Sequence, residues 1–226
     1  MKRLRTGAAA LAIAWLVGSG AAAGQAVGDR WEPSIQRFEA QDEAASPAPG
    51  GVVFVGSSSI VRWDLVSAFP ELEPAPINRG FGGSQMSDAA RYVDRIVIPH
   101  RPRLIVLYEG DNDLTSPASP EQIAAEFDRF ADAVHAALPG TRILVIAIKP
   151  SVQRWALIEK ARAANALIRR RCDTELWLTF VDVETPMLGA DGRPRPELYL
   201  EDGLHLSPEG YRIWNEALRP LLTGSR

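Results

Sequence analysis

Cysteine is nearly absent from this sequence: Cys172 is the only one among 226 residues. A single thiol cannot form an internal disulfide, so the fold must be held together by its core alone. Hydrophobic residues make up 46% of the chain, enough to bury a core, and the length fits one domain. We interpret Cys172, in the stretch "RRRC" near a helix end, as structural or incidental.

Long apolar runs are also lacking. The stretch 8–17 has ten residues, whereas a helix that spans a bilayer needs about 20. Three basic residues within 2–5 precede it and small residues follow, which is the order of a secretory signal. We predict a signal peptide over 1–26, cleaved near Ala23 or Ala26, and a secreted or periplasmic protein with no membrane span after cleavage. An uncleaved anchor is the alternative.

Acidic residues outnumber basic ones once this signal is removed. It carries three basic and no acidic residues, so 25 basic against 28 acidic residues become 22 against 28, and the formal charge moves from −3 to about −6. No basic tract remains that could neutralise a run of phosphates, which argues against nucleic acid as a partner. Neither an internal repeat nor a heptad pattern is present.

Strand and helix patterns alternate along the rest of the chain, after an N-terminal helix and a Pro/Ala/Gly-rich linker within 27–50. The apolar runs have strand length, as expected for strands buried on both faces. They lie at 52–56, 75–78, 103–110, 142–150 and 176–183, with helical patterns at 84–99, 119–140, 151–172 and 206–222. This alternation predicts one domain over 51–226, an α/β/α sandwich with a parallel, flavodoxin-like sheet of about five strands.

Histidine is scarce enough for its three positions to be considered in turn. His100 precedes a strand, at the edge of the sheet opposite to the usual ligand-binding edge, and His135 lies beside the apolar stripe of a helix. His205 lies in a loop before the last helix, three residues after Asp202. An acid in that position can hold one ring nitrogen, so His205 and Asp202 are candidates for a general base and its partner.

Three serines follow the first strand, in "VFVGSSSI". A hydroxyl on a tight turn after a strand projects above the sheet, and His205 with Asp202 would complete a triad in the order Ser…Asp…His. The α/β-hydrolase elbow G-x-S-x-G is not matched, because Ile60 replaces its second glycine.

Two other turns offer hydrogen-bond donors at the same edge of the predicted sheet. "NRGFGGS" (78–84) is rich in glycine, and "YEGDND" (108–113) ends a strand and carries Asn112. The N–H of Ser58, the N–H of Gly83 and the amide of Asn112 would give three donors to an oxyanion.

These blocks resemble those of the SGNH hydrolases, also called the GDSL esterase/lipase superfamily. "VGSSSI", "NRGFGGS", "GDND" and "DGLH" occur in the family's order and span residues 56–205. The resemblance implies a serine esterase without cofactor or metal, in which Ser58 is the nucleophile, Asp202 and His205 complete the triad, and Ser58, Gly83 and Asn112 form the oxyanion hole. The chain departs from the family at Ser57, where an aspartate is usual.

Several alternatives stay open. The same triad could serve an acyltransferase or a carbohydrate O-acetyl esterase, and the absence of a long apolar lid favours short acyl chains over lipid. Five hard ligands would suit a metal-dependent hydrolase: Glu109, Asp111, Asp113, Asp202 and His205. Exposed tryptophans would suit a non-catalytic carbohydrate-binding domain. Arg154 and Trp155, after the fourth strand, are candidates for the wall of a substrate cleft.

Overall fold

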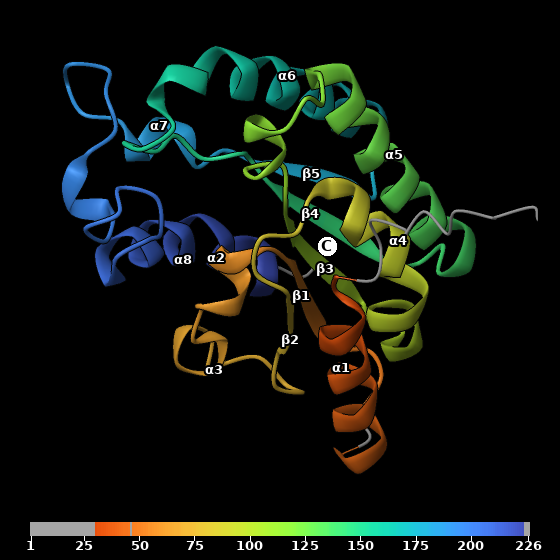
Figure 1. Ribbon diagram of the computed structural model, residues 1–226. Coiled ribbons are helices and arrows are strands. Elements are labelled where there is room, and N and C mark those ends of the chain that lie inside the picture. Colours follow the sequence, from red (N-terminus) through yellow and green to blue (C-terminus); the bar gives the residue numbers. More distant parts are fainter. Residues whose placement is uncertain (1–29, 46, 224–226) are drawn as a thin grey trace, which may run out of the picture.

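A five-stranded parallel sheet forms the centre of the molecule (Figure 1), in a computed structural model that describes residues 30–45 and 47–223. Its strands run in the order β2-β1-β3-β4-β5 and pair in parallel throughout. They are β1 (Val52–Gly56), β2 (Ile77–Gly80), β3 (Leu104–Tyr108), β4 (Arg142–Ile146) and β5 (Leu178–Val181). The predicted fold class is thereby confirmed. The predicted signal peptide over 1–26 lies outside the described residues.

Helices cover both faces of the sheet, which gives three layers (Figure 1). One face carries α1 (Glu32–Ala45), α4 (Met86–Ile96), α5 (Pro120–Ala137) and α6 (Ile158–Thr174). The other carries α2 (Ser58–Val61), α3 (Leu65–Ala68), α7 (Glu184–Met187) and α8 (Pro208–Thr223). Short 3-10 turns lie between them, at η1 (Ile98–His100), η2 (Asp113–Thr115), η3 (Trp155–Leu157) and η4 (Pro196–Leu198).

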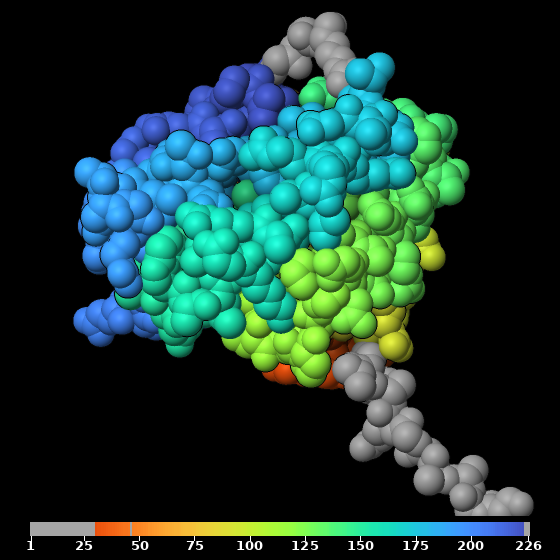
Figure 2. Space-filling model, turned by 90° about the horizontal axis from the view of Figure 1, so that it is seen from above, coloured from red at the N-terminus to blue at the C-terminus, as the bar shows by residue number. Residues whose placement is uncertain are grey.

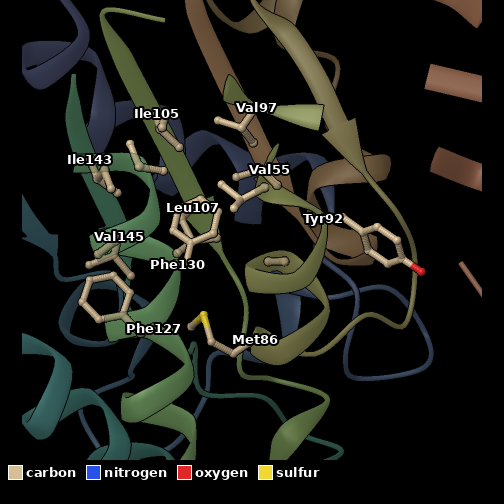
Figure 3. Close-up of a cluster of buried hydrophobic side chains, with 14 of the residues drawn as sticks. Val55, Met86, Tyr92, Val97, Ile105, Leu107, Phe127, Phe130, Ile143 and Val145 are labelled. Carbon is tan, nitrogen blue, oxygen red and sulfur yellow. The ribbon is translucent and has the colours of Figure 1, made fainter. Parts of the chain in front are cut away.

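The strands are apolar throughout because each face of the sheet is buried. In β1, Val53 and Val55 pack into the core under α4 and α5, whereas Val52 and Phe54 pack into the core under α8. This alternation follows from the two-residue period of a strand. Figure 3 shows the first core, in which side chains of the central strands meet Phe127 of α5.

The boundaries of several elements differ from those that the sequence predicts. The strand predicted at 75–78 begins only at Ile77, because Pro74 and Pro76 have no N–H to donate to a ladder. The strand predicted at 142–150 ends at Ile146; the Ala147 N–H still donates to Val181 C=O, and the Asn165 side chain then bonds both the N–H and the C=O of Ile148.

The N-terminal helix α1 belongs to the same core as the sheet. Its Ile35 and Phe38 are buried, and its Asp42 forms an ion pair with Arg79 of β2. His100 lies 3.3 Å from Asp42 and 3.1 Å from Arg79, and is buried with them. His100 therefore contributes to the contact between α1 and β2.

The surroundings of His135 and Cys172 indicate that both residues serve packing. His135 stacks on Trp177 with ring centres 4.3 Å apart, and Cys172 is buried in the core on the α6 side. Over the stretch from residue 30 to 223, residue 46 excepted, no helix combines the length and apolarity required to span a membrane.

Candidate active site

The loops that follow β1, β2 and β3 meet at the carboxyl edge of the sheet. The strand order reverses between β1 and β3, the place where ligands bind in open α/β sheets. Ser58 opens α2 directly after β1, and Asn112 follows β3. The loop before α8 brings His205 to the same place from the far end of the chain.

Ser58, His205 and Asp202 form a chain of hydrogen bonds. Ser58 Oγ lies 3.1 Å from His205 Nε2, and His205 Nδ1 lies 2.5 Å from Asp202 Oδ2. Asp202 Oδ1 also accepts the backbone N–H groups of Leu204 and His205, each at 2.9 Å. The bond from His205, together with these backbone bonds, lowers the pKa of Asp202 below its usual range, so its carboxylate stays ionised.

The loop that carries His205 is a tight hairpin held from two sides. Leu200 N–H donates to His205 C=O at 2.8 Å, and Tyr199 pairs with Leu206. The segment after β4 anchors the hairpin, because Tyr199 Oη donates to Pro150 C=O at 2.7 Å and Gln153 N–H donates to Gly203 C=O at 3.0 Å. These bonds place the loop that carries His205, and Asp202 holds its ring.

The turn after β1 presents only one of its three serines beside the histidine. Gly56 has φ +146°, and a Cβ there would lie 2.0 Å from Tyr108 C=O, so only glycine fits. Ser57 and Ser59 are each 2% exposed. Ser57 stands at the N-cap position of α2, but its hydroxyl makes no capping bond. Ser58 alone reaches His205.

The three donors expected for an oxyanion hole differ in their hydrogen bonds within the protein. In the part of the chain that the structure describes, the N–H groups of Ser58 and Gly83 donate to no protein acceptor. Gly83 has φ +86°, and its neighbour Gly82 packs against Ser58, where a Cβ would come within 3.7 Å of the serine Cβ. Asn112 Nδ2 donates one hydrogen to Ser84 C=O at 2.9 Å.

The acidic residues that the sequence offers as metal ligands have separate partners. Asp111 Oδ2 lies 2.5 Å from Lys149 Nζ, and Ser84 Oγ donates to Glu109 Oε1 at 2.5 Å. Asp113 accepts the N–H of Met86 at the start of α4. Across the described ranges, no three His, Cys, Asp or Glu side chains gather in an arrangement that could hold a metal ion.

The pKa values of these acids shift in different directions, although all three side chains are buried. Burial raises the pKa of Glu109 well above its usual range, and the bond from Ser84 only partly offsets this shift. Burial likewise raises the pKa of Asp113, to about 6. Burial acts in the same direction on Asp111, but the nearby charges of Lys149 and Arg154 outweigh it and lower that pKa.

Arg154 and Trp155, the candidates for a cleft wall, have different surroundings. The Arg154 guanidinium is largely buried and bonds Asp111 and Asn112. Trp155 is half-buried, with the guanidinium groups of Arg162 and Arg193 lying over its ring at 5.9 and 5.7 Å. Trp155 lines a cavity of about 310 Å³ with residues after β5.

A cavity of about 470 Å³ lies between α3 and the start of α8. Leu200 and Leu206, from the hairpin that carries His205, line it, whereas Ser58, Asp202 and His205 do not. The aromatic side chains of Trp63 and Tyr211 and the charged side chain of Arg62 also line this cavity. A larger cavity of about 690 Å³ lies between α6 and the residues after β5, on the face that Figure 2 shows.

A sequence model of the GDSL-like lipase/acylhydrolase family matches residues 63–213, about two thirds of the chain. The chain belongs to this family. The matched range contains Gly83, Asn112, Asp202 and His205, and begins shortly after Ser58. Members of this family are carboxylic ester hydrolases, and this chain is therefore an enzyme of that class. No curated protein matches the chain significantly.

Solved structures share the fold at low sequence identity. A protein from Streptococcus pneumonia named for platelet activating factor is 22% identical, with a TM-score of 0.76 over 84% of this chain and 92% of its own. A GDSL-like lipase from Bacteroides thetaiotaomicron is 21% identical, with a TM-score of 0.69 over 83% and 96%. A carbohydrate esterase family 3 structure from Talaromyces cellulolyticus is 18% identical, with a TM-score of 0.61 over 76% and 95%.

Sequence reasoning missed the residues that support these groups. Ser84 is completely buried and links Asn112 to Glu109, and Lys149 is buried against Asp111. A lysine that follows an apolar strand, and a glutamate within "LYEGD", were signals that charged side chains enter the interior. Neither signal identifies the residue that the buried charge contacts, because the two contacting residues are far apart in the sequence.

Proposed function

We propose that this chain hydrolyses carboxylic esters through an acyl-enzyme intermediate with Ser58 as the nucleophile. The observation that carries the proposal is the 3.1 Å contact between Ser58 Oγ and His205 Nε2, while Asp202 occupies the other ring nitrogen. A serine needs such a neighbouring base to attack at neutral pH.

The reaction follows from these positions. Ser58 Oγ bonds to the ester carbonyl carbon while its proton passes to His205 Nε2, and Asp202 stabilises the imidazolium. The carbonyl π electrons move onto the oxygen, which accepts hydrogen bonds from the N–H groups of Ser58 and Gly83 and from the Asn112 amide. The C–O bond to the alcohol then breaks, and His205 returns the proton to the alcohol oxygen. Water repeats the steps on the acyl-enzyme and releases the acid.

The decisive test is hydrolysis of p-nitrophenyl acetate by wild type and Ser58→Ala. We expect the alanine variant to lose at least about 10³-fold in kcat, because the nucleophile is removed. Ser34→Ala, a serine of α1, is the matched control and should retain the wild-type rate. Equal rates for wild type and Ser58→Ala would end the proposal.

For the substrate, we propose esters of short acyl groups, with acetylated carbohydrates as the first class to examine. The 470 Å³ cavity lined by Leu200 and Leu206, from the hairpin that carries His205, has the size of a small-molecule site. The carbohydrate esterase structures that share the fold favour acetylated sugars. A series of p-nitrophenyl esters and acetylated xylo-oligosaccharides tests this: kcat/KM should fall with acyl length, and a preference for dodecanoate over acetate would contradict it.

We also propose that the protein is exported, since a basic, apolar and small-residue order opens the sequence. N-terminal sequencing of protein recovered outside the cytoplasm should begin near residue 24 or 27. A full-length chain confined to the cytoplasm would contradict this proposal.

A further inference from the structure

Behind the candidate oxyanion hole lies a buried group of three charged side chains. Lys149 and Arg154 both contact the carboxylate of Asp111, at 2.5 and 2.6 Å. Their side chains are 1%, 14% and 7% exposed for Lys149, Arg154 and Asp111 respectively. Two cations and one carboxylate leave one net positive charge in a region with little water, where charge acts most strongly.

Arg154 extends this group to Asn112. Its Nη1 donates to Asp111 Oδ1 and to Asp111 C=O, each at 2.6 Å, and its Nη2 donates to Asn112 Oδ1 at 3.2 Å. The planar guanidinium thus reaches two neighbouring residues through two separate nitrogens, Nη1 and Nη2, whereas a lysine has a single nitrogen.

The Asn112 amide is fixed at both ends by these contacts. Its Oδ1 accepts from Arg154, while its Nδ2 donates one hydrogen to Ser84 C=O at 2.9 Å. If the amide turned over, Nδ2 would face the donor on Arg154 and Oδ1 would face the Ser84 carbonyl, so both bonds would be lost. The second Nδ2 hydrogen is left for the substrate oxygen.

We propose that Arg154 is a positioning residue for ester hydrolysis, which orients and polarises the Asn112 amide as an oxyanion donor. This inference rests on the proposed function. A hydrogen bond from a cation to Oδ1 draws electrons from the amide and makes Nδ2–H a stronger donor. The oxyanion forms in acylation and in deacylation, so kcat depends on this donor whichever step is slower.

A double-mutant cycle in the full chain tests the inference, with p-nitrophenyl acetate as the substrate. Arg154→Met should lower kcat by about 10- to 100-fold with KM changed less than about threefold, since one oxyanion donor is worth about 10²–10³ in rate. In an Asn112→Ala background the same change should lower kcat less than about threefold, because the donor through which Arg154 acts is already gone.

Two further variants separate this role from a structural one. Arg154→Lys keeps the charge near Asp111 but lacks the second nitrogen that contacts Asn112, so we expect a loss of kcat between those of wild type and Arg154→Met. Arg129→Met, which breaks an exposed pair with Glu126, is the matched control and should leave kcat and KM unchanged. If Arg154→Met fails to fold, Arg154→Lys carries the cycle in both backgrounds.

The outcomes are distinct. Equal fold losses of kcat in the wild-type and Asn112→Ala backgrounds would overturn the inference. So would a raised KM with unchanged kcat, which would place Arg154 on the substrate. If Ser58→Ala abolishes hydrolysis while Arg154→Met does not alter kcat, this inference fails and the proposed function stands; if Ser58→Ala hydrolyses at the wild-type rate, the proposed function itself fails.

Discussion

The substitution Asp202→Asn removes the carboxylate that orients the base His205 while leaving the hairpin in place. Asp202 Oδ1 accepts two backbone N–H groups at 2.9 Å, from Leu204 and His205, and only an oxygen can hold that position. The amide nitrogen of asparagine must then take the place of Oδ2, which lies 2.5 Å from His205 Nδ1. Because an amide nitrogen is a donor, His205 is driven to the tautomer with its proton on Nε2.

That tautomer cannot accept the proton of Ser58, so the rate should fall sharply. In the serine-protease example of this substitution the loss is about 10⁴-fold. The Asp202 side chain here is 44% exposed, so water can compensate in part, and we expect a loss of about 10²- to 10⁴-fold in kcat/KM.

The assay is p-nitrophenyl acetate hydrolysis at pH 8, with thermal unfolding measured in parallel. Asp202→Asn should melt within a few degrees of wild type, since both backbone bonds survive. Asp173→Asn, an exposed acid of α6, is the matched control. Activity of Asp202→Asn within about threefold of wild type would refute the tautomer argument.

Three other substitutions test the supporting structure. Glu109→Gln should become more stable relative to wild type as pH rises. Because burial raises the folded pKa of Glu109, the wild type loses up to about 1.4 kcal/mol of unfolding free energy per pH unit above the unfolded pKa of 4.5, and glutamine does not. Urea denaturation at pH 5 and pH 8 checks this, and the same difference at both pH values would contradict it. Gly83→Ala should lower the free energy of unfolding by about 1 kcal/mol, because φ is +86° and the new Cβ would lie 3.3 Å from Trp31. Gly140→Ala, whose Cβ would meet open space, is the control and should lower it less. Equal melting temperatures for the two variants would contradict backbone strain at Gly83. Trp214→Ala, at a completely buried position, should cost about 3–5 kcal/mol in free energy of unfolding, and a loss below about 1 kcal/mol would mean that this core repacks freely.

Periodicity in the sequence is enough to predict the sheet and most of the helices. The central strands are apolar on both faces because two helical layers cover them, and Ser119 with Pro120 starts α5 with the capping box that such residues favour. The order of the strand-end blocks predicts which loops meet, since parallel strands end at one edge. His205, Ser58 and Asp202 come together there.

The parts that could not be predicted depend on side chains that meet from distant positions. The helix expected over 151–172 begins only at Ile158, because the preceding segment folds back and Arg154 bonds Asp111. Arg154 looks like a cleft residue in the sequence, and only its partners show that it contacts Asn112. Likewise, no local pattern pairs Asp42 of α1 with His100.

The most direct test asks which atom becomes covalently modified. Wild-type protein treated with an alkyl fluorophosphonate, which reacts with activated serines, would be digested and the adduct located by mass spectrometry. We predict one adduct on Ser58, absent from Ser58→Ala and retained in Ser57→Ala and Ser59→Ala. An adduct on Ser57 or Ser59, or unchanged labelling of Ser58→Ala, would contradict the account.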